Sequence, residues 1–232
     1  MIKILATALL LTTSISAQAA IINGGFETGN LDNWSSSGSV SASAGDSLVS
    51  PFDGSFSAKL TTQGTTAAGL ASIMGISEAT LEASNGGINA TDGSLIYQST
   101  YAEVGDSFTF NWNFVEKDYV PYDDWAFYGI SLNGAAADIT KFASLATVGP
   151  GGGTTVNGWE SLTVNITATG NYTFYFGIVN ALDTALDSDL WIDGFSGTGS
   201  LDPNAIPEPA PLALMGLGLV ALSLSRKKKR NI

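Results

Sequence analysis

Apolar and polar residues alternate with a period of two in several stretches of this 232-residue chain. Residues 107–115 show it most clearly, because aromatic side chains occupy alternate positions and threonine or asparagine stands between them. Residues 161–167 and 171–178 alternate in the same way. This period is typical of β-strands with one buried face. It predicts strands at these positions, and we expect further strands at 54–62, 94–102, 125–132 and 189–195.

Helical signals are sparse. One or two helical turns are expected near Ser77 to Ala83, with Gly86 or Gly87 ending them. The surrounding residues 63–92 are small and polar, which indicates an insertion or an ordered surface loop, and residues 148–158 are expected to form a flexible loop. Many strands and almost no helix predict an all-β domain over residues 20–196, either a β-sandwich or a jelly roll.

The N-terminus has the pattern of a secretory signal peptide. Lys3 precedes the short apolar run 4–11, and Ala17-Gln18-Ala19 forms a small-x-small cleavage site. The pattern predicts export through the Sec translocon and removal of residues 1–19 by signal peptidase. The alternative is an uncleaved anchor, although the apolar run is too short to span a bilayer.

The C-terminus is built from three parts that follow a Gly/Ser/Pro linker at 197–206. A Pro-Glu-Pro triplet comes first, the apolar segment 210–225 follows, and a basic cluster ends the tail. As a helix the apolar segment reaches roughly 24 Å, which spans a bilayer with modest thinning and snorkelling. The basic cluster holds the C-terminus in the cytoplasm, so the preceding chain is predicted to lie outside. The residues are Pro207, Glu208 and Pro209 in the triplet, and Arg226, Lys227, Lys228, Lys229 and Arg230 in the cluster.

This tail, residues 207–230, resembles the PEP-CTERM sorting signal of Gram-negative bacteria. The resemblance implies recognition by exosortase, a membrane-embedded enzyme that cuts its carrier near the triplet. It also implies transient inner-membrane anchoring through the C-terminal helix, followed by release or attachment at the cell surface or in the extracellular matrix. Carriers of such tails are common in species that make exopolysaccharide, biofilm or flocs. The alternative is a single-pass anchor that is never cut.

Composition narrows the chemistry of the region between the two end signals. Residues 20–206 contain three lysines, no arginine and 20 acidic residues, a net charge of −17. Such a surface repels phosphate backbones, so nucleic acid is excluded as a partner. The chain has no histidine and no cysteine. These absences exclude a Ser-His-Asp triad, imidazole-ligated zinc and disulfides, and leave carboxylates as the main candidates for chemistry.

Three segments resemble strands of galactose-binding-like jelly rolls, a superfamily that contains many carbohydrate-binding modules. Asn23 to Trp34 resembles the first strand, Gly54 to Ala58 the second and Asp187 to Phe195 the last. Residues 93–131 look like ectodomains commonly joined to PEP-CTERM tails. The resemblance implies a structural calcium ion at Glu27 and Asp193, completed by backbone carbonyls. The alternative is that Glu27 caps a turn and Asp193 faces solvent.

A second candidate site combines acidic and aromatic residues between two predicted strands. Such a loop could bind a sugar through stacking and charged hydrogen bonds, or a cation. The alternative is an acidic turn whose aromatic residues complete the core. The residues are Glu116, Asp118, Tyr119, Tyr122, Asp123, Asp124 and Trp125.

Three functions are compatible with these patterns. The sequence favours a non-catalytic surface or matrix protein that binds a glycan. A second hypothesis is a secreted glycoside hydrolase or lyase that uses a carboxylate pair, either Glu116 with Asp118 or Asp123 with Glu160. A third is a structural or adhesive protein that binds no glycan. No catalytic residue is predicted, and calcium is the one cofactor that the resemblance implies.

Overall fold

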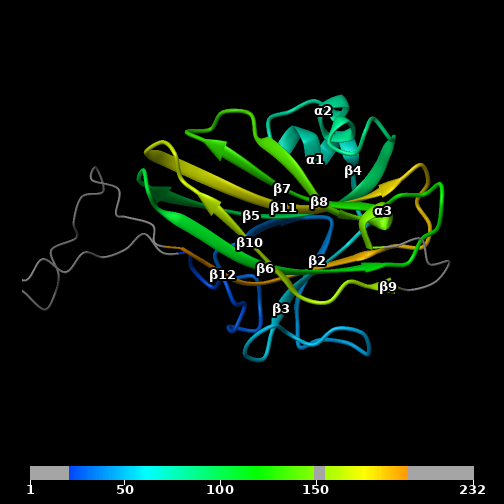
Figure 1. Ribbon diagram of the computed structural model, residues 1–232, viewed down its shortest axis with the longest axis horizontal. Helices are drawn as coiled ribbons and strands as arrows, with labels where there is room; N and C mark the ends of the chain where they lie inside the picture. The colour runs from blue at the N-terminus through cyan, green and yellow to red at the C-terminus, as the bar shows by residue number, and fades with distance from the viewer. Residues whose placement is uncertain (1–20, 149–154, 198–232) are drawn as a thin grey trace, which may run out of the picture. The chain divides into compact units, whose positions relative to one another are not determined.

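The computed structural model describes residues 21–148 and 155–197, and within them two antiparallel β-sheets face each other (Figure 1). The predicted signal peptide, the sorting tail and the linker beyond Gly197 lie outside the described residues. So does the predicted membrane segment 210–225. Among the described residues, no helix combines the length and apolar character needed to cross a membrane.

Each sheet has six strands, and every pairing is antiparallel. The first sheet has the order β1 (Ser35–Ser37), β5 (Ala90–Ala102), β11 (Gly170–Ala181), β7 (Trp125–Leu132) and β8 (Asp138–Ser144), and β4 (Thr65–Thr66) also pairs with β5. The second has the order β10 (Glu160–Asn165), β6 (Ser107–Glu116), β12 (Asp189–Gly197), β3 (Ser57–Thr61) and β2 (Ser39–Ser43), and β9 (Thr155–Val156) also pairs with β6.

The strand order is that of a jelly roll. One sheet contains β5-β11-β7-β8 and the other contains β3-β12-β6-β10, so that the chain passes repeatedly from one sheet to the other. The predicted β-sandwich is therefore confirmed. The strands predicted from alternation are also confirmed, with boundaries that differ by a few residues.

The main core lies between the sheets and is rich in aromatic rings. The aromatic residues at alternate positions of β6 are buried, as the period of two predicts, and they meet those of β11. Phe195 of β12 is at the centre, with its ring centroid 5.2 Å from that of Phe174 and 5.3 Å from that of Phe176. Rings at these separations stabilise the core beyond the area they bury.

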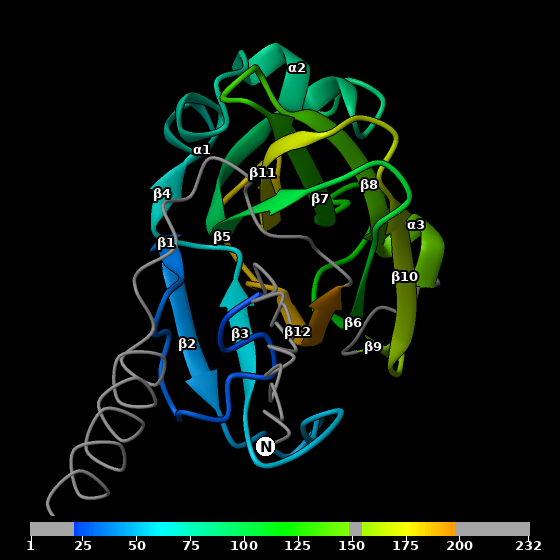
Figure 2. The same ribbon diagram turned by 90° about the vertical axis from the view of Figure 1, so that its left-hand side faces the viewer.

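Two helices cover the outer face of the first sheet (Figures 1 and 2). They are α1 (Ala67–Ile73) and α2 (Glu78–Ala83), and their buried residues pack with Trp125 and Phe127 of β7. The helix expected at Ser77 to Ala83 is confirmed, with Ser77 as its N-cap. Of the two predictions for residues 63–92, the surface loop is wrong, because Leu70, Met74 and Leu81 of this segment are fully buried in a second core cluster.

Other local predictions need correction. Residues 23–34 form a run of turns with positive φ at Asn23, Phe26 and Asn33, and the first strand begins only at Ser35. Strands β2 and β8 were not predicted, since β2 is mostly serine and β8 alternates only weakly. The expected loop 148–158 contains β9, and α3 (Leu145–Val148) precedes it.

Candidate functional site

Glu27 and Asp193 both hold the same loop, residues 52–56, through its backbone amides. Both carboxylate oxygens of Glu27 accept a hydrogen bond from Ser55 N, at 3.0 and 2.9 Å, and Oε1 also accepts from Phe56 N at 2.9 Å. Asp193 Oδ2 accepts from Phe52 N and Asp53 N at 2.9 and 3.2 Å. Its Oδ1 accepts from the adjacent Gly194 N at 2.7 Å. The two carboxylates thus tie the N-terminal turns, the loop and β12 together.

Local backbone geometry makes this close approach feasible. Gly54 has φ +64° and lies against the carboxylate of Glu27, so a Cβ at this position would collide with it. Asp193 is fully buried, and burial raises the pKa of its carboxyl group although three backbone N–H groups oppose the shift. Every carboxylate oxygen at these two residues already accepts an amide hydrogen bond. The sequence predicted Asp193 either as a calcium ligand or as a solvent-facing side chain, and neither prediction included these hydrogen bonds to the loop. The calcium ion at Glu27 and Asp193 stays a prediction.

The predicted ligand-binding residues of the loop between β6 and β7 fall into a buried group and an exposed group. Glu116, Asp118 and Asp124 are 0, 1 and 0% exposed. Tyr119 is 51% exposed, whereas Tyr122 and Asp123 are partly exposed. Trp125 is fully buried with the helices on the first sheet, which agrees with a role in the core. Only Tyr119, Tyr122 and Asp123 of this set can therefore meet a ligand at the surface.

The buried acids gather around Ser188, which precedes β12. Ser188 Oγ lies 3.2 Å from Glu116 Oε1 and 2.8 Å from Asp124 Oδ2. Asp118 N donates to Glu116 Oε1 at 2.8 Å, and Ala181 N donates to Asp124 Oδ1 at 3.0 Å. Burial raises the pKa of Glu116 to about 7 and that of Asp124 to about 8, and the neighbouring acids add to both shifts. Sequence reasoning missed Ser188, because no motif links it to residues 64 and 72 positions away.

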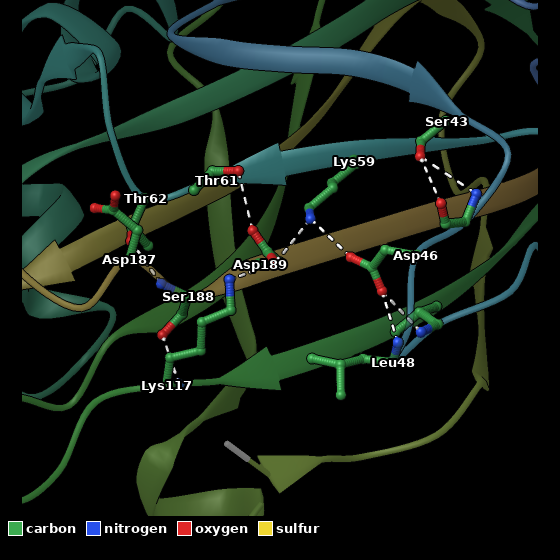
Figure 3. Close-up of polar contacts among 12 residues, drawn as sticks. Ser43, Asp46, Leu48, Lys59, Thr61, Thr62, Lys117, Asp187, Ser188 and Asp189 are labelled. Atoms are coloured by element: carbon green, nitrogen blue, oxygen red, sulfur yellow. Dashed lines mark hydrogen bonds and ion pairs between the residues drawn. The ribbon is translucent and has the colours of Figure 1, made fainter. Parts of the chain in front are cut away.

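Two of the three lysines in residues 20–206 are paired with another acid, Asp189 (Figure 3). Asp189 Oδ2 lies 2.6 Å from Lys117 Nζ and 3.1 Å from Lys59 Nζ. Lys59 also pairs with Asp46 at 2.9 Å and lies 5.0 Å from the ring centroid of Trp191. This network stabilises the second sheet and leaves neither ammonium group free for the buried acids around Ser188.

The exposed part of the β6–β7 loop borders a pocket of about 270 Å³, lined by Val120, Pro121, Asp123, Leu145 and Ala146. The rings of Tyr119 and Tyr122 lie next to each other in an edge-to-face pair, with centroids 5.4 Å apart. Asp123 is fixed because its Oδ1 accepts from Ala146 N at 2.9 Å and its Oδ2 from Asn85 Nδ2 at 3.3 Å. The loop thus offers a pair of aromatic rings and a small pocket lined mainly by apolar residues.

The carboxylate pairs considered for hydrolysis differ in their surroundings. Glu116 and Asp118 are both buried. Asp123 bonds to the start of α3, whereas the exposed Glu160 accepts from Asn157 Nδ2 at 3.0 Å at the start of β10. In the described part of the chain, no three acidic side chains are placed together so that they hold a metal ion among them.

Comparison with known proteins identifies the C-terminal tail and finds solved structures with a similar fold. Residues 205–228 match the family model of the PEP-CTERM protein-sorting motif, which indicates an exported protein with a C-terminal sorting signal and implies processing by exosortase. Among curated proteins, no significant match to the chain was found.

Structural neighbours include carbohydrate-binding modules with β-sandwich folds. TmCBM61, solved with β-1,4-galactotriose, is 16% identical over 80% of this chain and 100% of its own, with a TM-score of 0.48. The CBM22-1 xylan-binding domain from Paenibacillus barcinonensis is 12% identical over 77% and 93%, with a TM-score of 0.39. The K3 cleaved adhesin domain of Lys-gingipain from Porphyromonas gingivalis is 14% identical over 78% and 100%, with a TM-score of 0.40. Each is a similarity of fold alone.

Proposed function

We propose that this chain is an exosortase-processed protein of the cell surface or extracellular matrix, and that its jelly roll binds a glycan without catalysing a reaction. The sorting motif at residues 205–228 supports the first part. The net charge of −17 between the end signals suits a soluble domain outside the cell. An association with exopolysaccharide, in biofilm or flocs, is the setting we propose for it.

The observation that carries the glycan part is the ring pair of the exposed Tyr119 and the partly exposed Tyr122, in the loop whose residues 120, 121 and 123 line the pocket. Aromatic rings bind the apolar faces of sugar rings, and a tyrosine hydroxyl adds a hydrogen bond. The fixed carboxylate of Asp123 at the pocket supplies an acceptor for sugar hydroxyls. A shallow site of this kind suits one or two sugar units of a longer chain.

A glycan array and a pull-down with the exopolysaccharide of the producing strain test the glycan part. We expect the exported protein to bind, and Tyr119→Ala with Tyr122→Ala to weaken binding at least tenfold. Val104→Ala is the matched control, because Val104 is 66% exposed but follows β5 at the other end of β6. Flat responses of the unaltered protein in both assays would remove the glycan part and leave a structural or adhesive role.

The intact mass of the protein at the cell surface or in the medium tests the export part. We expect a product that lacks residues 1–19 and is cut near Pro207 to Pro209. Deletion of the exosortase should leave the tail attached and the protein in the inner membrane. An uncut tail in the normal strain would instead identify a permanent anchor.

A further inference from the structure

Three buried carboxyl groups at the end of the jelly roll have no cationic partner in the described residues. Glu116, Asp118 and Asp124 are at most 1% exposed. Lys59 and Lys117 pair with Asp189, and Lys141 Nζ donates to Asn85 Oδ1 at 2.7 Å and to Ser144 Oγ at 3.5 Å. Residues 20–206 contain no other basic side chain. Buried charge without compensation is costly, so this cluster needs positive charge from outside the chain or must remain protonated.

Hydrogen bonds within the chain leave one oxygen unsatisfied in two of these groups. Oε2 of Glu116 and Oδ2 of Asp118 are buried and have no hydrogen-bond partner. Ser188 Oγ lies within hydrogen-bond distance of both Glu116 and Asp124, but one hydroxyl carries one proton and can donate to only one of them. Buried acceptors left unpaired are rare and point to a missing ion, water or proton.

The contrast with Glu27 and Asp193 is informative. There every carboxylate oxygen accepts a backbone N–H, so the local structure is complete as it stands. At Glu116 and Asp118 one oxygen of each carboxylate is unused. The carboxylate oxygens left without a hydrogen bond therefore lie at the end of β6, and not at Glu27 and Asp193.

We propose that the end of β6 binds a divalent cation, Ca²⁺ by preference, through the unpartnered oxygens Glu116 Oε2 and Asp118 Oδ2, with Asp124 adding negative charge nearby. Calcium accepts six to eight oxygen ligands in flexible geometry, so two carboxylates are completed by neutral oxygens and water. No three acidic side chains of the described residues are arranged to hold a metal ion together, so the two carboxylates would need these neutral ligands. A bound ion would fix the start of the β6–β7 loop, just before Tyr119.

Calcium titration of the full chain, purified in mild detergent and freed of metal with EDTA, tests this site. We expect a calorimetric dissociation constant of about 10⁻⁴–10⁻³ M, the range of extracellular modules, and a rise in Tm with Ca²⁺. Glu116→Gln with Asp118→Asn should abolish this binding. Glu27→Gln with Asp193→Asn is the matched control at the other carboxylate pair and should retain it.

The outcomes separate clearly. Loss of Ca²⁺ binding only in the Glu27/Asp193 variant would overturn the proposal, as would an unaltered titration in the Glu116/Asp118 variant. An unaltered chain that binds no Ca²⁺ would also overturn it and indicate that protons satisfy the cluster. Far-UV circular dichroism in EDTA checks that each variant is folded. If the double variant is unfolded, Asp118→Asn alone replaces it and should weaken Ca²⁺ binding at least tenfold. None of these calcium titrations depends on whether the protein binds a glycan.

Discussion

Lys117 Nζ of the β6–β7 loop lies 2.6 Å from Oδ2 of Asp189, the first residue of β12. Lys59 approaches the same oxygen from β3, and Thr61 donates to the other oxygen at 3.0 Å. Asp189 is 1% exposed, so its charge depends on these partners. One buried carboxylate therefore connects three segments at the end of the second sheet where the acids around Ser188 also lie.

Asp189→Asn is expected to destabilise the domain by about 1.5–3 kcal/mol, because it removes the negative charge that two lysines share and one of the two acceptor oxygens. The measurement is chemical denaturation monitored by tryptophan fluorescence. Asp138→Asn, at an exposed position of β8, is the control and should change the free energy of unfolding by less than about 0.5 kcal/mol. Equal changes in the free energy of unfolding for the two variants would show that the ion pairs at Asp189 do not stabilise the domain.

Metal-free protein is expected to lose stability as the pH rises from 5 to 8. The pKa of Glu116 rises from an ordinary 4.5 to about 7 in the folded chain, and that of Asp124 from 3.8 to about 8. Between the unfolded and folded values the folded state binds more protons, so the free energy of unfolding falls with pH. The fall should exceed about 1.4 kcal/mol, the equivalent of one pKa unit.

Denaturation curves in EDTA at several pH values check this dependence. Glu116→Gln should flatten the profile, since the glutamine carries no titrating proton. Added Ca²⁺ should oppose the fall, because metal and protons compete for the same carboxylates. A profile that rises from pH 5 to 8 in EDTA would contradict the raised pKa values.

Asp193→Asn is expected to loosen the 52–56 loop. Asparagine has one acceptor oxygen, so it cannot serve both Gly194 N and the amides of Phe52 and Asp53. The expected cost is about 1–3 kcal/mol, together with faster proteolysis within the loop. Asp53→Asn at the exposed tip of the loop is the control. Unchanged proteolysis in Asp193→Asn would mean that other contacts hold the loop.

Phe195→Ala is expected to cost about 3–5 kcal/mol, because the ring fills the space between the sheets and contacts rings of β6 and β11. Thermal unfolding of the two proteins measures it. Phe52→Ala removes a ring that is 49% exposed and should cost much less. Similar losses for both would argue against Phe195 as the centre of the core.

By itself the sequence determined the class of fold and the C-terminal sorting motif. Alternation in β6 and β11 predicts strands because side chains on a strand alternate between its faces, and this rule is local. The sorting tail is likewise a local pattern, which the match at residues 205–228 confirms. Burial of α1 was not predictable, since its small residues become core only when the first sheet lies beneath them.

Only the tertiary structure decided which polar residues meet. Ser188 lies between Glu116 and Asp124 because strand order brings the end of β6 and the start of β12 together, across 72 positions of sequence. The same order pairs the ammonium groups of Lys117 and Lys59 with Asp189, the residue after Ser188, and not with Glu116 or Asp124. Charge can be counted along a chain, but its compensation depends on distances that exist only after folding.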